Sequence, residues 1–249
     1  MQELVKNEAT ATESQIKAYQ NRIGSLTYTA IISRPDIAKA VSKLAEFQQN
    51  PSQAHIDAAN HCLKYLISTK NLAIMYDGNI SSKQIFMAAS DAAFSDDVTT
   101  RFSSNGFCFQ LYGGVIHYKA TKQRTVTTSS TEAELLALST TAKEFIWWKR
   151  LFENLDFDLE SEMTIFCDNQ QTIRLMSRDT PRLTTKLKHV DVHSCWLRQE
   201  VQSKRLKISW IPTADMVADG FTKLLSPQKH ARFVEQLRLI DVSTELATS

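Results

Sequence analysis

The chain lacks a long apolar run. Among its 249 residues no stretch reaches the roughly 18 consecutive apolar residues that a transmembrane helix needs. The first residues, MQELVKNEATATESQ, are polar and contain no apolar core of the kind found in secretion signals. The sequence therefore predicts no membrane partner. It favours an intracellular, cytoplasmic location, with a particle-associated or nuclear location as the alternative.

Cysteines are few and far apart. The four are Cys62, Cys108, Cys167 and Cys195, and no two of them form a CxxC pair. This spacing excludes a disulfide framework and a zinc ribbon, so we interpret them as thiols in a reducing compartment. Motifs of other enzyme classes are missing as well: the chain has no HExxH, no GxSxG and no GxxxxGK[ST] sequence.

A strong net charge is also missing, since the formal charge is only +2. The distribution is uneven, however. Residues 182–207 carry seven Lys and Arg against Asp191 and Glu200. Such a segment suits a nucleic-acid backbone, although a solvated helix face would have the same composition.

The first quarter of the chain has the pattern of three helices. Apolar residues recur at helical spacing over 11–69, and Pro35 and Asn50-Pro51 stand where helices begin. We predict a disordered N-terminus over 1–12 and a helical subdomain over 13–70. A second domain is expected over 71–240, followed by a tail over 241–249.

The second domain is predicted to be α/β. Residues 105–119 predict a hairpin around Gly113-Gly114, and 130–155 predict a long helix. Three antiparallel strands followed by alternating strands and helices imply a mixed sheet flanked by helices. The remaining expected elements are strands at 72–76, 84–90, 163–167 and 206–211, and helices at 170–176, 188–202 and beyond 214.

Four acidic residues stand where reactive groups gather in such sheets. Asp91 and Asp168 each close a predicted strand, Glu134 lies near the start of the long helix, and Asp219 follows the last predicted strand. Converging carboxylates are what two Mg²⁺ ions need for phosphoryl transfer, and Mn²⁺ is an alternative. Taken alone, an Asp at a strand end is more often a turn former or a helix cap, so the set of four matters more than any one member. Asp215, one helical turn before Asp219, could take its place.

The stretch TTSSTEAELLAL (127–138) contains two glutamates with different expected tasks. Ser129 and Glu132 have the spacing of a capping box, in which Glu132 would accept from the Ser129 amide. Glu134 then points along another side of the helix, because each residue turns the chain by about 100°. It is free to face Asp91 and Asp168.

Five ordered motifs give the chain a family resemblance. They are SDAAF (90–94), SSTEAELLAL (129–138), FCDNQQTI (166–173), LKHVDVHSCWLRQE (187–200) and WIPTADMVADGFTK (210–223). Together they resemble the ribonuclease H region of a copia-class retrotransposon Pol polyprotein. The stretches 23–44 and 61–76 resemble the thumb or connection segment before it. The resemblance implies a ribonuclease H-like fold that hydrolyses the RNA strand of an RNA–DNA hybrid, with Asp91, Glu134, Asp168 and Asp219 as catalytic metal ligands.

We expect further residues to contact nucleic acid. Asn169 and Gln170 could bind the sugar edges of a hybrid or cap a helix. His189 and His193 have the spacing of two zinc ligands, but no Glu follows His189, so a nucleic-acid or structural role is favoured. The full predicted contact set is Ser90, Asn169, Gln170, Lys186, Lys188, His189 and Arg198.

Some positions depart from the family pattern. Ala93 and Phe94 stand where the family often has an acid and a tryptophan, and Cys195 stands where a histidine is common. The chain lacks the YxDD polymerase motif, so we expect it to be part of a larger Pol polyprotein or a remnant of one. Two alternatives to an active ribonuclease H remain open: an inactive nucleic-acid-binding remnant, and an integrase-like nuclease. The sequence does not define an oligomeric state.

Overall fold

A computed structural model of the protein describes residues 4–77, 85–159, 162–176 and 188–243, apart from the side chain of His189. The chain forms two compact units. One consists of residues 1–75 and 226–249, and the other of residues 76–225. No helix in the described part of the chain is long and apolar enough to cross a membrane.

The first unit is mainly helical. Its helices are α1 (Glu13–Ile32), the 3₁₀ helix η1 (Pro35–Ile37), α2 (Ala38–Ala45), α3 (Gln53–Ser68) and α8 (Pro227–Gln236). Two short strands, β1 (Leu72–Ile74) and β7 (Leu239–Asp241), pair antiparallel. The three predicted helices are therefore present. Their apolar stripes form a core that contains Tyr19, Ile23, Leu26, Val41, Leu44 and Cys62.

The boundaries of this unit differ from the predicted domain limits. Residues 71–75 and 226–240 were expected in the α/β domain, but β7 pairs with β1, and His230 bonds to the Asp36 carbonyl at 3.1 Å. The short strand β7 carries only three residues, so no period was visible in the sequence. Leu237 and Leu239 of this returning segment are buried.

Residues 7–11 are held by hydrogen bonds, although disorder was predicted for 1–12. The Asn50 side chain donates to the carbonyls of Asn7 and Ala9 at 3.1 and 2.9 Å, and it accepts from the Ala11 amide at 2.9 Å. Asn50 therefore anchors this segment. It does not cap α3, because Ser52 is the N-cap and forms a capping box with His55.

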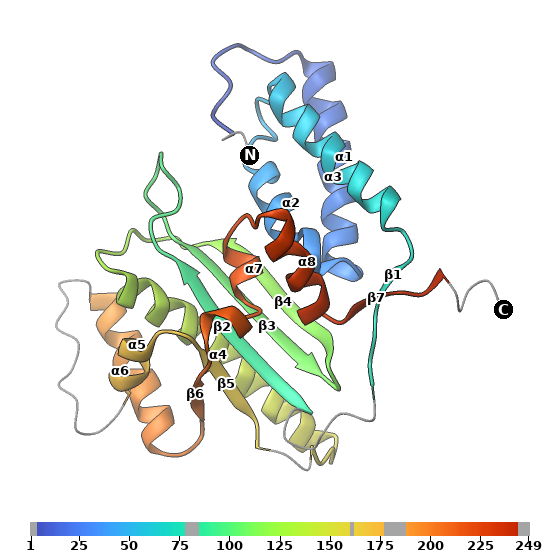
Figure 1. The fold of residues 1–249 in the computed structure, drawn as a ribbon. Coiled ribbons are helices and arrows are strands. Elements are labelled where there is room, and N and C mark those ends of the chain that lie inside the picture. The colour runs from blue at the N-terminus through green and yellow to red at the C-terminus, as the bar shows by residue number, and fades with distance from the viewer. Residues whose placement is uncertain (1–3, 78–84, 160–161, 177–187, 244–249) are drawn as a thin grey trace. The chain divides into compact units, whose positions relative to one another are not determined.

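The second unit is built on a mixed five-stranded sheet. Its strands are β2 (Phe86–Ala93), β3 (Ser104–Leu111), β4 (Gly114–Lys122), β5 (Thr164–Cys167) and β6 (Ile208–Trp210). The order across the sheet is β4-β3-β2-β5-β6 (Figure 1). β2, β3 and β4 are antiparallel neighbours, whereas β5 runs parallel to both β2 and β6. The predicted ribonuclease H-like mixed sheet is confirmed.

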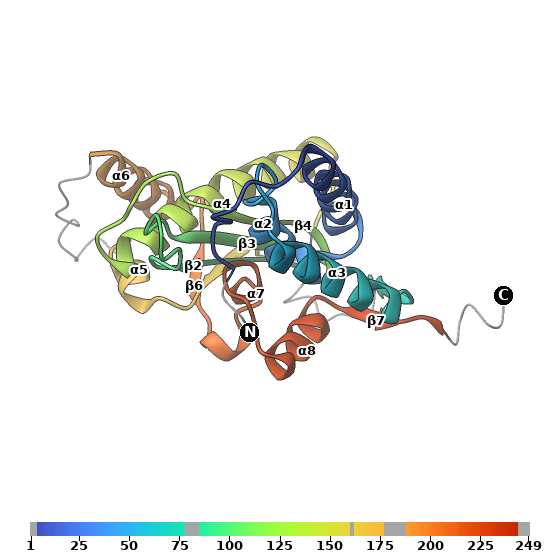
Figure 2. The same ribbon diagram turned by 90° about the horizontal axis from the view of Figure 1, so that it is seen from above.

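Helices cover both faces of this sheet. The long helix α4 (Ser130–Asn154) lies on one face, and the short helix α7 (Asp219–Thr222) lies on the other (Figure 2). α6 (Lys188–Gln202) packs beside α4, and Ser139 joins them through a hydrogen bond of 2.7 Å with His193 Nδ1. The predicted structural role of this helix is thus found at His193. Among the described residues of this unit, the remaining helices are α5 (Gln170–Arg174) and η3 (Thr213–Asp215).

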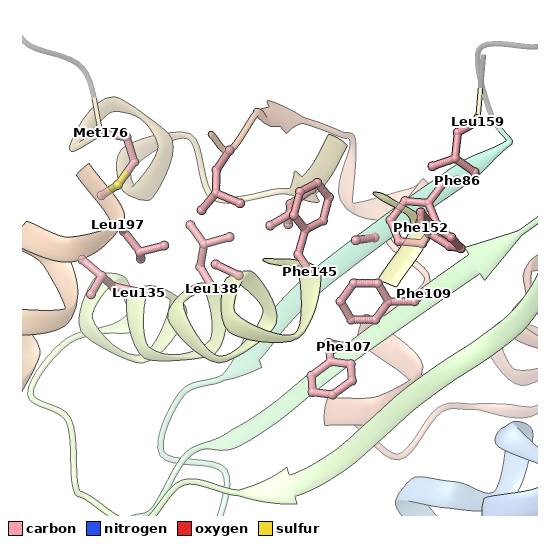
Figure 3. Close-up of a cluster of buried hydrophobic side chains, with 14 of the residues drawn as sticks. Phe86, Phe107, Phe109, Leu135, Leu138, Phe145, Phe152, Leu159, Met176 and Leu197 are labelled. Carbon is pink, nitrogen blue, oxygen red and sulfur yellow. The ribbon is translucent and has the colours of Figure 1, made fainter. Parts of the chain in front are cut away.

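The main hydrophobic core lies between α4 and the sheet. Leu135, Leu138 and Phe145 of α4 are buried in this core. Phe145 packs against Phe86 of β2, and Leu135 lies beside Leu197 of α6 (Figure 3). Leu135, Leu138 and Phe145 are spaced along α4 at the period of an amphipathic helix, so they lie on one buried face. Trp148 packs against this core, whereas Trp147 is mostly exposed.

On the opposite face, Gly106 of β3 allows an unusually close approach by α7. A Cβ atom at this glycine would stand 2.8 Å from Thr222 Cγ2 and 2.9 Å from Phe221 Cβ. Gly106 also lies directly opposite Asp91 in the β2–β3 register. Because Gly106 has no side chain, α7 can lie close to β3 beside Asp91 of the neighbouring strand β2.

Gly106→Ala is expected to destabilise the protein by about 1–3 kcal/mol, because its methyl group must displace α7. Urea unfolding followed by circular dichroism measures the change. Gly24→Ala is the matched control, since Gly24 is exposed within α1 and an added Cβ meets nothing within 4 Å. That substitution should stabilise its helix by about 0.5–1 kcal/mol. Equal stability of Gly106→Ala and the wild type would contradict the close approach.

Candidate metal and catalytic centre

Asp91 lies on the central strand β2 and is almost completely buried, with 1% of its surface exposed. The Thr222 hydroxyl, on α7, donates a hydrogen bond to Asp91 Oδ2. Burial raises the pKa of Asp91 to about 6, against the opposing effects of Lys223 and the Thr222 hydrogen bond. The charges of Asp219 and Asp168 also contribute to this rise in the pKa of Asp91. The Asp91 carboxyl is therefore held in place and lies within electrostatic reach of two other acids.

Glu134 approaches the same place from α4. It is 7% exposed, and its carboxylate accepts a hydrogen bond from the Ala92 backbone. Its Oε2 atom is fully buried and finds no hydrogen-bond donor among the described residues. Burial, followed by the charges of Asp91 and Asp168, raises the pKa of Glu134 to about 9. A buried carboxylate oxygen with no donor is costly unless a cation or a proton compensates for it.

Asp168 follows β5, where two neighbouring side chains fix it. The Thr213 hydroxyl donates to Asp168 Oδ2 at 2.8 Å, and the Trp210 indole donates to the Asp168 carbonyl at 3.1 Å. Ligand atoms of Glu134, Cys167 and Asp168 all lie within 4.8 Å of one another. Burial raises the pKa of the Cys167 thiol, which opposes a thiolate. The carboxylate oxygens are therefore the better ligands in this group.

Asp219 is the first residue of α7 and forms an ion pair with Lys223. The Lys223 Nζ atom also lies 3.8 Å from Asp91 Oδ2. Asp215, by contrast, is exposed on η3. Asp219 and Asp91 share Lys223 as a neighbour, which brings Asp219 close to Asp91.

The two glutamates of 127–138 have separate environments. Ser129 is the N-cap of α4, and its hydroxyl accepts from the Glu132 amide at 3.2 Å. Glu132 Oε2 accepts from both the amide and the hydroxyl of Thr128 at 2.7 Å. The partner predicted for Glu132 was the Ser129 amide, so the bond is displaced by one residue. Glu132 still closes the start of the helix, and Glu134 faces the acidic centre.

The predicted nucleic-acid contacts have mixed outcomes. Ser90 is fully buried and its hydroxyl accepts from Thr141 Oγ1 at 2.9 Å, so it is a packing residue and not a surface contact. Asn169 caps α5 by accepting from the Thr172 amide at 3.0 Å. Gln170 and Lys188 are exposed, and Arg198 is partly exposed on α6. Lys186 and the side chain of His189 lie outside the described part of the chain.

Three residues of the centre were not predicted from the sequence. Thr222 and Lys223 lie within WIPTADMVADGFTK, but nothing in the sequence connects them with Asp91. Thr222, for example, is 131 residues away from Asp91 along the chain. Thr213 lies in the same stretch. Hydroxyl and ammonium groups next to an acid carry a weak sequence signal, because Thr and Lys are common on surfaces.

The sequence has relatives among retrotransposon polyproteins. It is 35% identical over 211 residues to the retrovirus-related Pol polyprotein from transposon TNT 1-94 of Nicotiana tabacum, a match of 85% of this chain and 15% of that protein. It is 33% identical over 220 residues to the corresponding polyprotein from transposon RE1 of Arabidopsis thaliana, covering 88% and 15%. The chain belongs to the copia-type retrotransposon Pol polyprotein family.

This copia-type Pol segment spans about 15% of the length of those relatives. No protein-family model matches it. Among solved structures, LC11-RNase H1, isolated from compost, is 16% identical with a TM-score of 0.36, covering 68% of this chain and 100% of that chain. Because that score is low, the ribonuclease H-like fold assignment depends on the strand order of the sheet itself.

Glu132→Gln is expected to lower the free energy of unfolding by about 1–2 kcal/mol, because a buried cap loses its charge-assisted acceptor. Urea denaturation measures the loss. Glu153→Gln, an exposed position on the same helix, is the control and should change stability by less than about 0.5 kcal/mol. An unchanged unfolding midpoint for Glu132→Gln would show that this residue does not close the helix.

Glu134→Gln should have the opposite effect on the metal-free protein. The pKa of Glu134 is raised to about 9 in the folded state from its ordinary value of 4.5, so the folded state binds more protons between these values. Stability is then lost as the pH rises from about 4.5 to about 9. Gln cannot ionise, so the variant should gain stability over the wild type at pH 8 but not at pH 4. Urea unfolding in EDTA at both pH values checks this; a variant less stable at pH 8 would contradict it.

Proposed function

We propose that this Pol segment is a metal-dependent endonuclease that hydrolyses the RNA strand of RNA–DNA hybrids. It would be the ribonuclease H part of a retrotransposon reverse transcriptase. The observation that carries the proposal is made at Glu134. Its Oε2 is a buried acceptor with no donor among the described residues, and one of its carboxylate oxygens belongs to a group of ligand atoms within 4.8 Å of one another. Membership in the copia-type family and the strand order of the sheet support it.

The donor set fits Mg²⁺, and Mn²⁺ equally. Carboxylate oxygens are the ligands that these hard cations prefer, and Asp91, Glu134, Asp168 and Asp219 would hold them. When bound, the ions supply Lewis-acid stabilisation of the charge that develops on the scissile phosphate.

The chain supplies the orientation of these ligands. The Thr222 hydroxyl fixes Asp91, and the Thr213 hydroxyl at 2.8 Å fixes Asp168. The Ala92 backbone bonds to the Glu134 carboxylate, whose Oε2 is buried and has no hydrogen-bond partner among the described residues. Loss of a supporting hydrogen bond of this kind commonly lowers metal affinity or activity by about 10- to 100-fold.

The hybrid would contact exposed polar and basic residues of this unit. Gln170 begins α5 directly after Asp168, and Lys188 begins α6. Not all of the basic segment 182–207 is available, because Arg205 pairs with Glu200 at 2.7 Å and Lys207 pairs with Glu162 at 2.5 Å. Lys188, exposed at the start of α6, and Arg198, partly exposed on the same helix, are the candidates for contacts with phosphates.

A non-catalytic nucleic-acid-binding protein is the second candidate. The ion pair of Lys223 with Asp219 favours it, because an internal cation already neutralises one of the four acids. The unpaired Glu134 Oε2 favours the nuclease instead.

The purified chain is expected to cut the RNA strand of a labelled hybrid in Mg²⁺. Asp168→Asn should slow cleavage by about 10²-fold or more, because Lewis-acid stabilisation is worth several kcal/mol. Asp215→Asn, which removes an exposed acid from η3, is the matched control and should retain cleavage. Gel analysis of single-turnover reactions gives both rates.

Two results would contradict the proposal. Undiminished cleavage by Asp168→Asn would remove this residue from the mechanism. Salt-sensitive hybrid binding by the wild type, without cleavage in Mg²⁺ or Mn²⁺, would establish the non-catalytic candidate.

A further inference from the structure

Lys223 is placed between two acids that come from different parts of the fold. Its Nζ atom forms an ion pair with Asp219 Oδ1 and lies 3.8 Å from Asp91 Oδ2. Among the described residues it is the only cation in an ion pair with any of the four acids of the centre. The ammonium thus stands on the Asp91–Asp219 side, where a metal cation would also be attracted.

This arrangement is not an ordinary pair on the surface of a helix. α7 has only four residues, and Lys223 is its C-cap with an extended backbone (φ −123°, ψ 147°). One partner, Asp91, is on β2 and its side chain is 2% exposed. Exposed i,i+4 pairs stabilise helices only slightly, whereas a cation next to a buried carboxylate offsets a much larger cost.

The centre has two unlike sides. Glu134 and Asp168, with Cys167, form the group of ligand atoms within 4.8 Å, and no lysine or arginine of the described chain pairs with these acids. The Asp91–Asp219 side is occupied by Lys223. Its side chain is 44% exposed, so the four-carbon stem can move the ammonium out into solvent.

We propose that Lys223 is a built-in counter-ion that competes with the second divalent ion for the oxygens of Asp91 and Asp219. This inference rests on the proposed function, since it presumes that the four acids bind metal. The Glu134–Asp168 side binds the first ion with Lys223 in place. The Asp91–Asp219 side binds an ion only when the ammonium leaves, so the second ion binds more weakly than the first.

Metal binding to the full chain, measured without substrate, tests the inference. Mn²⁺ titration followed by electron paramagnetic resonance counts the free ion and gives both dissociation constants. Lys223→Met keeps the length of the side chain and removes the charge, so the second Mn²⁺ should bind about tenfold more tightly or better. Lys223→Arg keeps the charge and should retain weak second-site binding.

Lys207→Met is the matched control, because Lys207 also forms an ion pair, with Glu162, in the same unit. It should leave both dissociation constants unchanged. In metal-free buffer, Lys223→Met should also melt at a lower temperature than Lys207→Met, and Mn²⁺ should raise its melting temperature by more than it raises that of the wild type.

A measurement on the wild type avoids any dependence on how the variants fold. Lysines carrying ¹³C-methyl groups give separate resonances, and Lys223→Arg identifies the one from Lys223. During a Mg²⁺ titration this resonance should move with the second, weaker binding step. Movement with the first step, or no movement, would overturn the inference.

The outcomes separate the two proposals. If the wild type and Asp168→Asn both fail to bind Mn²⁺, the proposed function fails. If the wild type binds two ions and Lys223→Met binds both with unchanged constants, the proposed function stands and the role of Lys223 is overturned.

Discussion

The mutual repulsion of four carboxylates is the constraint on which this structure depends. Asp91 is 1% exposed on the central strand, and Glu134 is 7% exposed on α4. Removing such charges from water is expensive, and bringing them together adds to the cost. The raised pKa values of Asp91 and Glu134 express that cost in the absence of a divalent ion. A divalent cation bound by these acids, as we propose, would offset that cost.

The surrounding fold holds the acids against this repulsion. Each comes from a different element, and those elements are fixed by ordinary forces. The core between α4 and the sheet positions Glu134, and the Thr128–Glu132 cap fixes the start of that helix. On the other face, Gly106 admits α7 close to β3, which brings Thr222 to Asp91. The core on the sheet, the Thr128–Glu132 cap and Gly106 therefore all help to position the acids of one centre.

Much of this could be predicted from the sequence, because hydrophobic period and turn residues define the helices and strands of the second unit. The long helix was expected at 130–155 and is observed at Ser130–Asn154. The separation of Glu132 from Glu134 followed from helix geometry alone. The choice of Asp219 over Asp215 depended on family resemblance, since both acids lie in one short stretch.

What could not be predicted depends on contacts between distant residues. Ser90 looked like a surface contact, but it bonds to Thr141 inside the protein. Residues 226–240 return to the helical unit through the pairing of β1 with β7. Strands of three residues are too short to show a period in the sequence, so this pairing could not be predicted. Lys223 meets Asp91 only because α7 packs on the sheet.

The most direct test is a crystal structure of the chain grown with Mn²⁺, with anomalous diffraction used to locate the ions. We expect an anomalous peak coordinated by Glu134 Oε2 and an Asp168 oxygen. A second peak should lie by Asp91 and Asp219, with the Lys223 ammonium withdrawn from both. A structure with no peak at these acids and with Glu134 Oε2 still lacking any partner would contradict the central claim that the carboxylates form a divalent-metal centre.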